Sequence, residues 1–133
     1  RNAERLGVSD RLDLHKSDLF SNVEGRFNMI VSNPPYIPTG DAGDLQAEVV
    51  DFDPHEALFG GEDGLDVIRR IVAGAPDHLK ANGYLLMEIG HGQAASVKEL
   101  FGPELWREVE IISDLQGIPR TLIAQADKLM END

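Results

Sequence analysis

The sequence FNMIVSNPPYIPTG, residues 27–40, joins a run of apolar residues to two consecutive prolines. An apolar run of this length is typical of a parallel strand that is covered on both faces. Each proline fixes its own φ at about −65° and lacks an N–H group, so neither can continue a strand ladder. We therefore expect a central strand over residues 27–33 that leads into a stiff segment rich in hydrogen-bond acceptors.

Strand and helix patterns alternate along the chain. Strand patterns occupy residues 11–18, 27–33, 83–90, 107–113 and 120–125, and helix patterns occupy residues 1–6, 68–79 and 93–101. Gly7 is the residue type expected just past a helix end, and Pro76 is expected to kink or split the second helix. This alternation predicts one α/β domain over residues 1–125, with a mainly parallel sheet, and a short tail over residues 126–133.

The composition argues against several classes of protein. Among the 133 residues 12 are basic and 24 are acidic, which gives a net charge of −12, and the basic residues form no cluster. Binding to nucleic acid is driven largely by Lys and Arg, so direct nucleic-acid binding is not expected. The absence of cysteine fits a reducing compartment, and no apolar run approaches the roughly 18 residues that a membrane span needs. We expect a soluble, cytoplasmic protein.

The segment after the expected strand at 27–33 is the candidate site. Ligands of α/β sheets bind at the carboxyl ends of the strands, and Asn33 and Pro34 lie at such an end. The Asn33 side-chain oxygen and the Pro34 carbonyl oxygen are neighbouring acceptors that can hold both hydrogens of an –NH2 group. Tyr36 is expected to form a flat wall beside a planar amide or base. The alternative is that Pro34 and Pro35 only mark the end of a strand.

The tetrapeptide Asn-Pro-Pro-Tyr, residues 33–36, resembles the motif that closes the fourth strand of S-adenosylmethionine-dependent methyltransferases acting on planar nitrogens. Some of those enzymes methylate adenine or guanine, and others methylate a glutamine side chain. The segment 37–63 looks like the HemK/PrmC family, the glutamine-N5 methyltransferases of peptide-chain release factors. Its matching pairs are Glu48-Val49, Asp53-Pro54, Ala57-Leu58 and Gly60-Gly61, followed by Gly64-Leu65. Asp53 and Phe59 depart from the family pattern, which usually has Glu before the proline and often has Asp before the glycines.

The resemblance covers residues 1 to about 125 and implies a class I methyltransferase with a Rossmann-like sheet of order 3-2-1-4-5-7-6, here lacking its first two strands. It implies S-adenosylmethionine as cofactor, no metal, and the glutamine of the Gly-Gly-Gln loop of release factors as target. Asn33 and Pro34 would be the catalytic residues that orient the target nitrogen. Pro35, Tyr36 and Glu48 would contact the substrate with them, although a solvated loop charge is an equally common role for a residue such as Glu48.

Asp18 and Leu19, together with Asn33, are the cofactor contacts that the resemblance implies. Asp18 matches the position at which related methyltransferases bind the adenine amino group, although capping a turn is an equally common use of aspartate. Leu19 lines the adenine pocket in this interpretation and is plain core in the alternative one. Glu88 is either a substrate-side carboxylate or an ordinary residue at a strand end.

The glycine-rich loop and the acidic residue that hold this cofactor in the family are expected upstream of Arg1. We therefore expect the chain to be a piece of a longer enzyme, inactive alone and a very weak binder of cofactor. Without its usual neighbours, the strand at 11–18 is expected to be displaced, to pair with the strand at 27–33, or to pair with another copy. Two alternative functions stay open: an amino methyltransferase acting on DNA or rRNA, and a non-catalytic remnant that binds release factor.

Overall fold

The computed structural model describes residues 1–39 and 59–127. Its sheet has four strands in the order β1-β2-β4-β3. The strands are β1 (Phe27–Ser32), β2 (Leu79–Glu88), β3 (Trp106–Ser113) and β4 (Pro119–Ala126). The helices are α1 (Asn2–Arg5), α4 (Asp66–Gly74) and α5 (Ala94–Lys98), with 3-10 turns at η1 (Ser9–Arg11) and η3 (Ala75–His78).

The sheet is mixed, which corrects the expectation of a mainly parallel sheet. β1 runs parallel to β2, whereas β2 and β3 both run antiparallel to β4. The reason is the tight turn between β3 and β4, since a connection this short can only join antiparallel strands. In that turn Asp114 Oδ1 accepts hydrogen bonds from the backbone N–H groups of Gln116 and Ile118 over 2.8 and 3.0 Å. The observed strand order matches the 4-5-7-6 part of the order that the resemblance implies.

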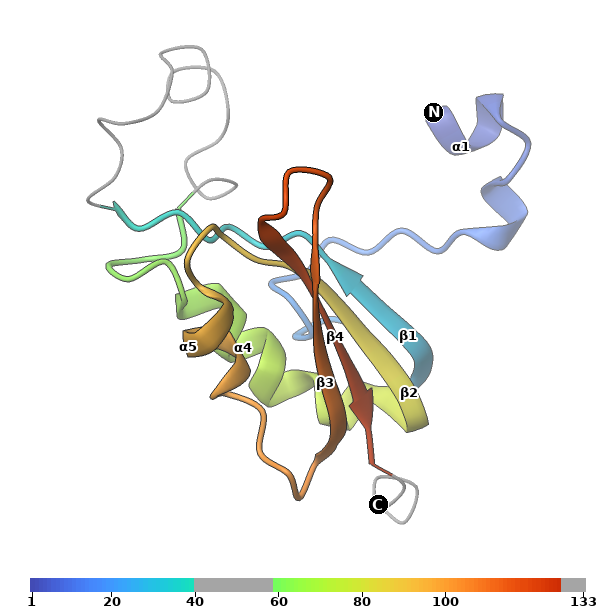
Figure 1. The fold of residues 1–133 in the computed structure, drawn as a ribbon. Coiled ribbons are helices and arrows are strands. Elements are labelled where there is room, and N and C mark those ends of the chain that lie inside the picture. The colour runs from blue at the N-terminus through green and yellow to red at the C-terminus, as the bar shows by residue number, and fades with distance from the viewer. Residues whose placement is uncertain (40–58, 128–133) are drawn as a thin grey trace, which may run out of the picture.

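One face of the sheet carries the hydrophobic core. α4 and α5 lie on the same side of the sheet (Figure 1), and Ile68 and Ile71 of α4 belong to the same buried hydrophobic cluster as Leu85 of β2. α4 ends at Gly74 and continues as the 3-10 turn that contains Pro76, so the expected split of this helix is confirmed. The helix expected over 93–101 is shorter in the structure, where α5 begins at Ala94 and ends at Lys98.

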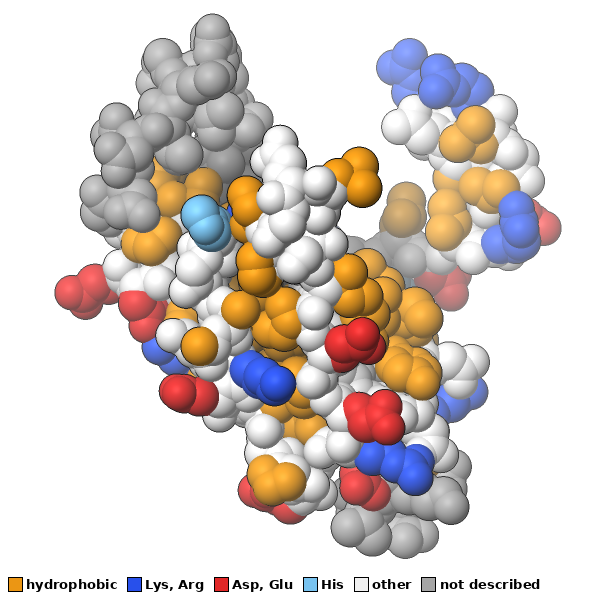
Figure 2. All heavy atoms as spheres, in the orientation of Figure 1, with side chains coloured by type: hydrophobic (Ala, Val, Ile, Leu, Met, Phe, Trp, Pro, Cys, Tyr) orange, Lys and Arg blue, Asp and Glu red, His pale blue; other side chains and the backbone are white. Residues whose placement is uncertain are grey.

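β1 is an edge strand among the described residues, not the covered central strand that its composition predicts. Its side chains Phe27, Met29 and Val31 are 42%, 52% and 70% exposed. Hydrophobic side chains gather on the surface over β1 and β2 (Figure 2). The sequence of β1 indicates that its apolar side chains can be covered. It cannot show whether a neighbouring element is present to cover them.

The strand expected over residues 11–18 is absent, and that prediction is wrong. Residues 12–18 have neither helix nor strand, and they lead away from the sheet toward α1 (Figure 1). Leu12 and Leu14 are 48% and 85% exposed, so their alternation with polar residues buries no face. A strand needs a partner for its backbone, and the segment has none among the described strands.

Candidate active site at the ends of β1 and β2

The segment Asn33–Tyr36 follows directly after β1 and has no regular secondary structure. Asn33 is exposed, Pro34 is buried, and Pro35 and Tyr36 are half-buried. Among the described residues, neither the Asn33 side chain nor the Pro34 carbonyl oxygen has a hydrogen-bond partner. The predicted end of the strand at the prolines is confirmed, and no described residue occupies either of the two expected acceptors.

Tyr36 is held at both its side chain and its backbone. Its hydroxyl donates a hydrogen bond to Glu88 Oε1 over 2.7 Å, and its carbonyl oxygen accepts one from Gln93 Nε2 over 2.8 Å. Burial raises the pKa of the Tyr36 hydroxyl, and the hydrogen bond and negative charge of Glu88 raise it further. The segment after β1 is therefore fixed against the end of β2 and the turn that follows it.

Three glycines make room for this segment. A Cβ atom on Gly60 would lie 2.5 Å from the Pro35 carbonyl oxygen, and one on Gly64 would lie 2.3 Å from the Tyr36 carbonyl oxygen. A Cβ atom on Gly90 would lie 2.9 Å from the Tyr36 ring. Real Cβ atoms do not approach other atoms this closely, so any larger residue would push the segment away. The sequence indicates Gly60 and Gly64 only as matches to the family pattern and assigns none of the three glycines a role in packing against this segment.

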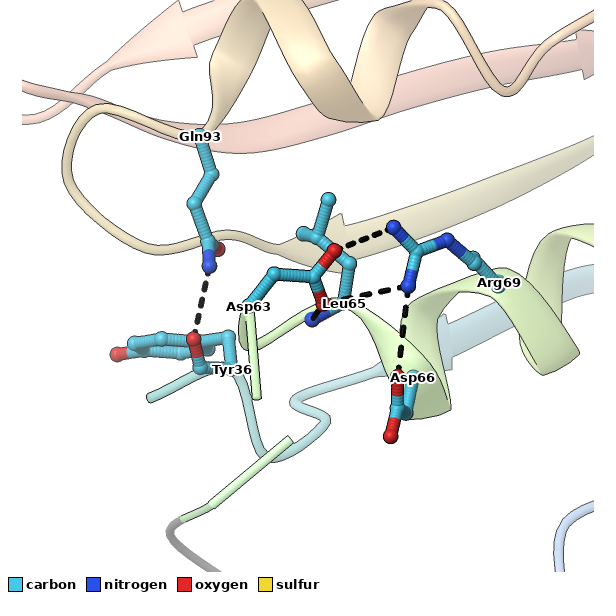
Figure 3. A network of polar contacts seen from close by, with 6 residues as sticks. All are labelled: Tyr36, Asp63, Leu65, Asp66, Arg69 and Gln93. Atoms are coloured by element: carbon cyan, nitrogen blue, oxygen red, sulfur yellow. Dashed lines mark hydrogen bonds and ion pairs between the residues drawn. The ribbon is translucent and has the colours of Figure 1, made fainter. Parts of the chain in front are cut away.

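The turn at residues 60–64 is in turn tied to the start of α4. Asp63 Oδ1 accepts hydrogen bonds from the Leu65 backbone N–H over 3.0 Å and from Arg69 Nη1 over 3.2 Å (Figure 3). The hydrogen bond with Arg69 is the main reason why the pKa of Asp63 is lowered. The Gly60 N–H also donates to the Ile37 carbonyl oxygen over 3.0 Å. The turn thus connects the backbone just past Tyr36 to a helix of the core.

Asp18 and Leu19 lie in the loop before β1. Among the described residues, the Asp18 carboxylate caps no backbone group but pairs with Arg70 Nη2 over 2.8 Å, and this hydrogen bond lowers the pKa of Asp18. Leu19 is half-buried and lines an apolar groove of about 250 Å³, which it shares with Ile30 and Ser32 of β1. The groove therefore runs beside β1 to the residue that precedes Asn33.

Glu48 lies outside the described residues, as do residues 40–58 of the segment that resembles the HemK/PrmC family. Glu88, for which two roles were open, accepts the hydrogen bond of the Tyr36 hydroxyl. No group of three or more metal-binding side chains occurs in residues 1–39 and 59–127. Within the same residues, none of the helices has the length and hydropathy to cross a membrane.

No protein-family model matches the chain, but curated relatives match most of it. The release factor glutamine methyltransferase of Koribacter versatilis is 44% identical over 126 residues, which are 93% of this chain and 44% of the relative. That of Geobacter sulfurreducens is 45% identical over 123 residues, which are 92% of this chain and 43% of the relative. The chain spans less than half the length of these relatives.

The solved structures that superpose on this chain are also methyltransferases. A release factor-specific protein-(glutamine-N5) methyltransferase from Alicyclobacillus acidocaldarius superposes with a TM-score of 0.50 at 31% identity, over 77% of this chain and 50% of that one. A methyltransferase from Pyrococcus furiosus has a TM-score of 0.53 at 22% identity, over 77% and 42%, which bears on the fold alone. The chain therefore has a partial class I methyltransferase fold, and the resemblance to release factor glutamine methyltransferases is confirmed.

Proposed function

We propose that this chain forms the target-amide site of a release factor glutamine methyltransferase, which transfers a methyl group to the side-chain nitrogen of the glutamine in a Gly-Gly-Gln loop. The observation that supports this most directly is the pair of acceptors on Asn33 and Pro34, which have no partner among the described residues and follow one another just before the anchored Tyr36. The names of the curated relatives favour the same target.

The chemistry explains why acceptors are placed there. An amide nitrogen is a weak nucleophile, because its lone pair is delocalised into the carbonyl group. Hydrogen bonds from the –NH2 group to the Asn33 side-chain oxygen and the Pro34 carbonyl would orient the lone pair and favour the positive charge that develops on nitrogen. The proton then leaves after the transfer. A general base is not needed for this step.

The cofactor in this proposal is S-adenosylmethionine, which when bound supplies an electrophilic methyl group. Its adenine ring would lie in the groove beside β1, where Leu19 and Ile30 supply apolar walls. The Asp18 side chain is 70% exposed. A carboxylate can accept several hydrogen bonds, so Asp18 can accept one from the adenine amino group in addition to the one from Arg70. Asn33 follows Ser32 at the end of this groove, and in this proposal it would lie between the cofactor and the target amide.

The acidic balance of the chain suits a protein partner better than a nucleic acid. Its net charge of −12 would repel a phosphate backbone, whereas a release factor that works on ribosomal RNA is expected to carry basic patches. Cytoplasmic location is part of the proposal, because the chain has no cysteine that would point to an oxidising compartment.

The test uses a chimera, because the chain spans less than half of its relatives. In this chimera the chain replaces the matching 123 residues of the Geobacter sulfurreducens relative. With tritium-labelled S-adenosylmethionine, we expect label on release factor, and none when the Gly-Gly-Gln glutamine is changed to alanine. Label on DNA or rRNA instead would favour a nucleic-acid amino methyltransferase. Calorimetric binding of release factor without any binding of cofactor would favour a non-catalytic remnant.

A further inference from the structure

Gln93, the residue before α5, uses both ends of its side-chain amide. Its Oε1 accepts a hydrogen bond from the Gly90 backbone N–H over 2.8 Å, and its Nε2 donates one to the Tyr36 carbonyl oxygen over 2.8 Å. Figure 3 shows the side chain reaching from its turn to Tyr36. One amide thus joins the turn after β2 to the segment after β1.

The polarity of these two bonds suits a primary amide. The Gly90 N–H needs an acceptor, and the Tyr36 carbonyl oxygen needs a donor, so the side chain at position 93 must offer one of each. A carboxylate offers acceptors only, and an apolar side chain offers neither.

The surroundings of Gln93 leave its amide little room to move. A Cβ atom on Gly64 would lie 2.8 Å from Gln93 Nε2, and one on Gly90 would lie 2.7 Å from Gln93 Oε1. Both positions are glycine, so the amide fits closely between two backbone segments. A close fit of this kind restricts the Tyr36 carbonyl to one position relative to the turn after β2.

We infer that Gln93 is a positioning residue for methyl transfer, an inference that rests on the proposed function. It holds the Tyr36 carbonyl, and the two prolines before Tyr36 have fixed φ angles, so a shift at Tyr36 is passed back to the Pro34 carbonyl and to Asn33. Gln93 does not contact the target amide itself in this account. Its effect is on where the two acceptors lie, and small displacements of reacting groups are costly in rate.

The experiment compares Gln93→Met and Gln93→Glu in the chimera with Gln125→Met as the matched control. Gln125 also donates from its amide to a backbone carbonyl, that of Asn82 over 3.2 Å, but it lies on β4 and pairs with Tyr84, away from the end of β2 at Glu88. We expect kcat for release factor to fall about tenfold to a hundredfold in both Gln93 variants, with KM for S-adenosylmethionine changed less than about twofold. Gln125→Met should keep kcat within about twofold.

The pH profile gives a readout that a loss of folding does not. Protonation of the carboxyl introduced by Gln93→Glu restores an O–H donor toward the Tyr36 carbonyl. Relative to Gln93→Met, the rate of Gln93→Glu should therefore recover as the pH falls through the pKa of that carboxyl, which for glutamate is about 4.3 in the absence of other influences. Equal pH profiles for the two variants would count against a specific role of the donor.

Amide exchange and chemical shifts in the 133-residue chain test the positioning itself. Exchange of the Gly90 N–H should be faster in Gln93→Met, and the carbonyl carbon shift of Tyr36 should change in both variants. An unchanged Tyr36 shift, or a Gln93→Met chimera with kcat within about twofold of the parent, would overturn the inference. An inactive parent chimera would overturn the proposed function instead, and the Tyr36 shift would still decide whether Gln93 holds this segment.

Discussion

The Tyr36 hydroxyl donates a 2.7 Å hydrogen bond to Glu88 Oε1, and this bond joins the segment after β1 to the last residue of β2. Burial and the Glu88 carboxylate both raise the pKa of Tyr36, because each disfavours a phenolate at this position. The folded chain therefore keeps the Tyr36 proton to a higher pH than the unfolded chain does.

A titration of Tyr36 should show this directly. Tyr84→Phe leaves Tyr36 as the only tyrosine of the two in the sequence. In this background, Glu88→Gln should lower the pKa of Tyr36 measured by ultraviolet absorbance, because it removes a negative charge. As the pH rises past about 10, where an unfolded tyrosine ionises, the unfolded state binds fewer protons than the folded state, so the free energy of unfolding should fall. The fall should be smaller in Tyr36→Phe, and a Glu88→Gln pKa equal to the parent value would contradict this account.

The parts of the fold that follow from local sequence were predictable. The prolines at 34 and 35 follow the end of β1, and Pro76 lies in the 3-10 turn that follows α4. Gly7 follows α1 with a φ of 69°. Each of these features depends on the backbone preferences of one or two residues. The strand at 11–18 could not be judged in this way, because its stability depends on a neighbouring strand that no local pattern reveals.

The residues of the candidate site also fall into those that local sequence indicates and those that depend on contacts formed by folding. Asn33, Pro34 and Tyr36 belong to one contiguous motif, residues 33–36, so the sequence indicated them as a group. Gln93 is 57 positions from Tyr36, and its role depends on a contact that only folding creates. The position of Asp18 beside Arg70 is likewise a contact between segments 52 residues apart.

Asn33→Ala should reduce the rate of methyl transfer in the chimera. The variant removes one of two acceptors that orient the target amide, and loss of one such group at a transition state costs about two to three orders of magnitude. Affinity for S-adenosylmethionine should change less than about threefold, which a calorimetric titration measures. Single-turnover transfer within a few-fold of the parent would exclude the role proposed for Asn33.

Gly64→Ala and Gly117→Ala separate backbone strain from lack of space. Both glycines have a φ of 80°, where an alanine costs about 1 kcal/mol. A Cβ on Gly117 meets nothing within 4 Å, whereas one on Gly64 would lie 2.3 Å from the Tyr36 carbonyl oxygen. Urea unfolding should show a loss of about 1 kcal/mol for Gly117→Ala and a further loss of about 1–3 kcal/mol for Gly64→Ala. Equal losses would mean that the segment after β1 yields without cost.

The edge of β1 that pairs with no described strand should make the 133-residue chain associate. An unpaired strand edge is a template for pairing with another chain, and Val31 is 70% exposed on this edge strand, beside Met29 at 52%. Val31→Lys adds a charge to the edge, which disfavours such pairing. Leu115→Lys is the matched control, because Leu115 is fully exposed in the turn between β3 and β4.

Light scattering at rising concentration should give a mass above 14.6 kDa for the parent and for Leu115→Lys, and a mass close to 14.6 kDa for Val31→Lys. A parent that stays monomeric at high concentration would show that β1 does not act as a pairing edge, and an equal effect of both lysines would show that exposed apolar side chains in general drive the association.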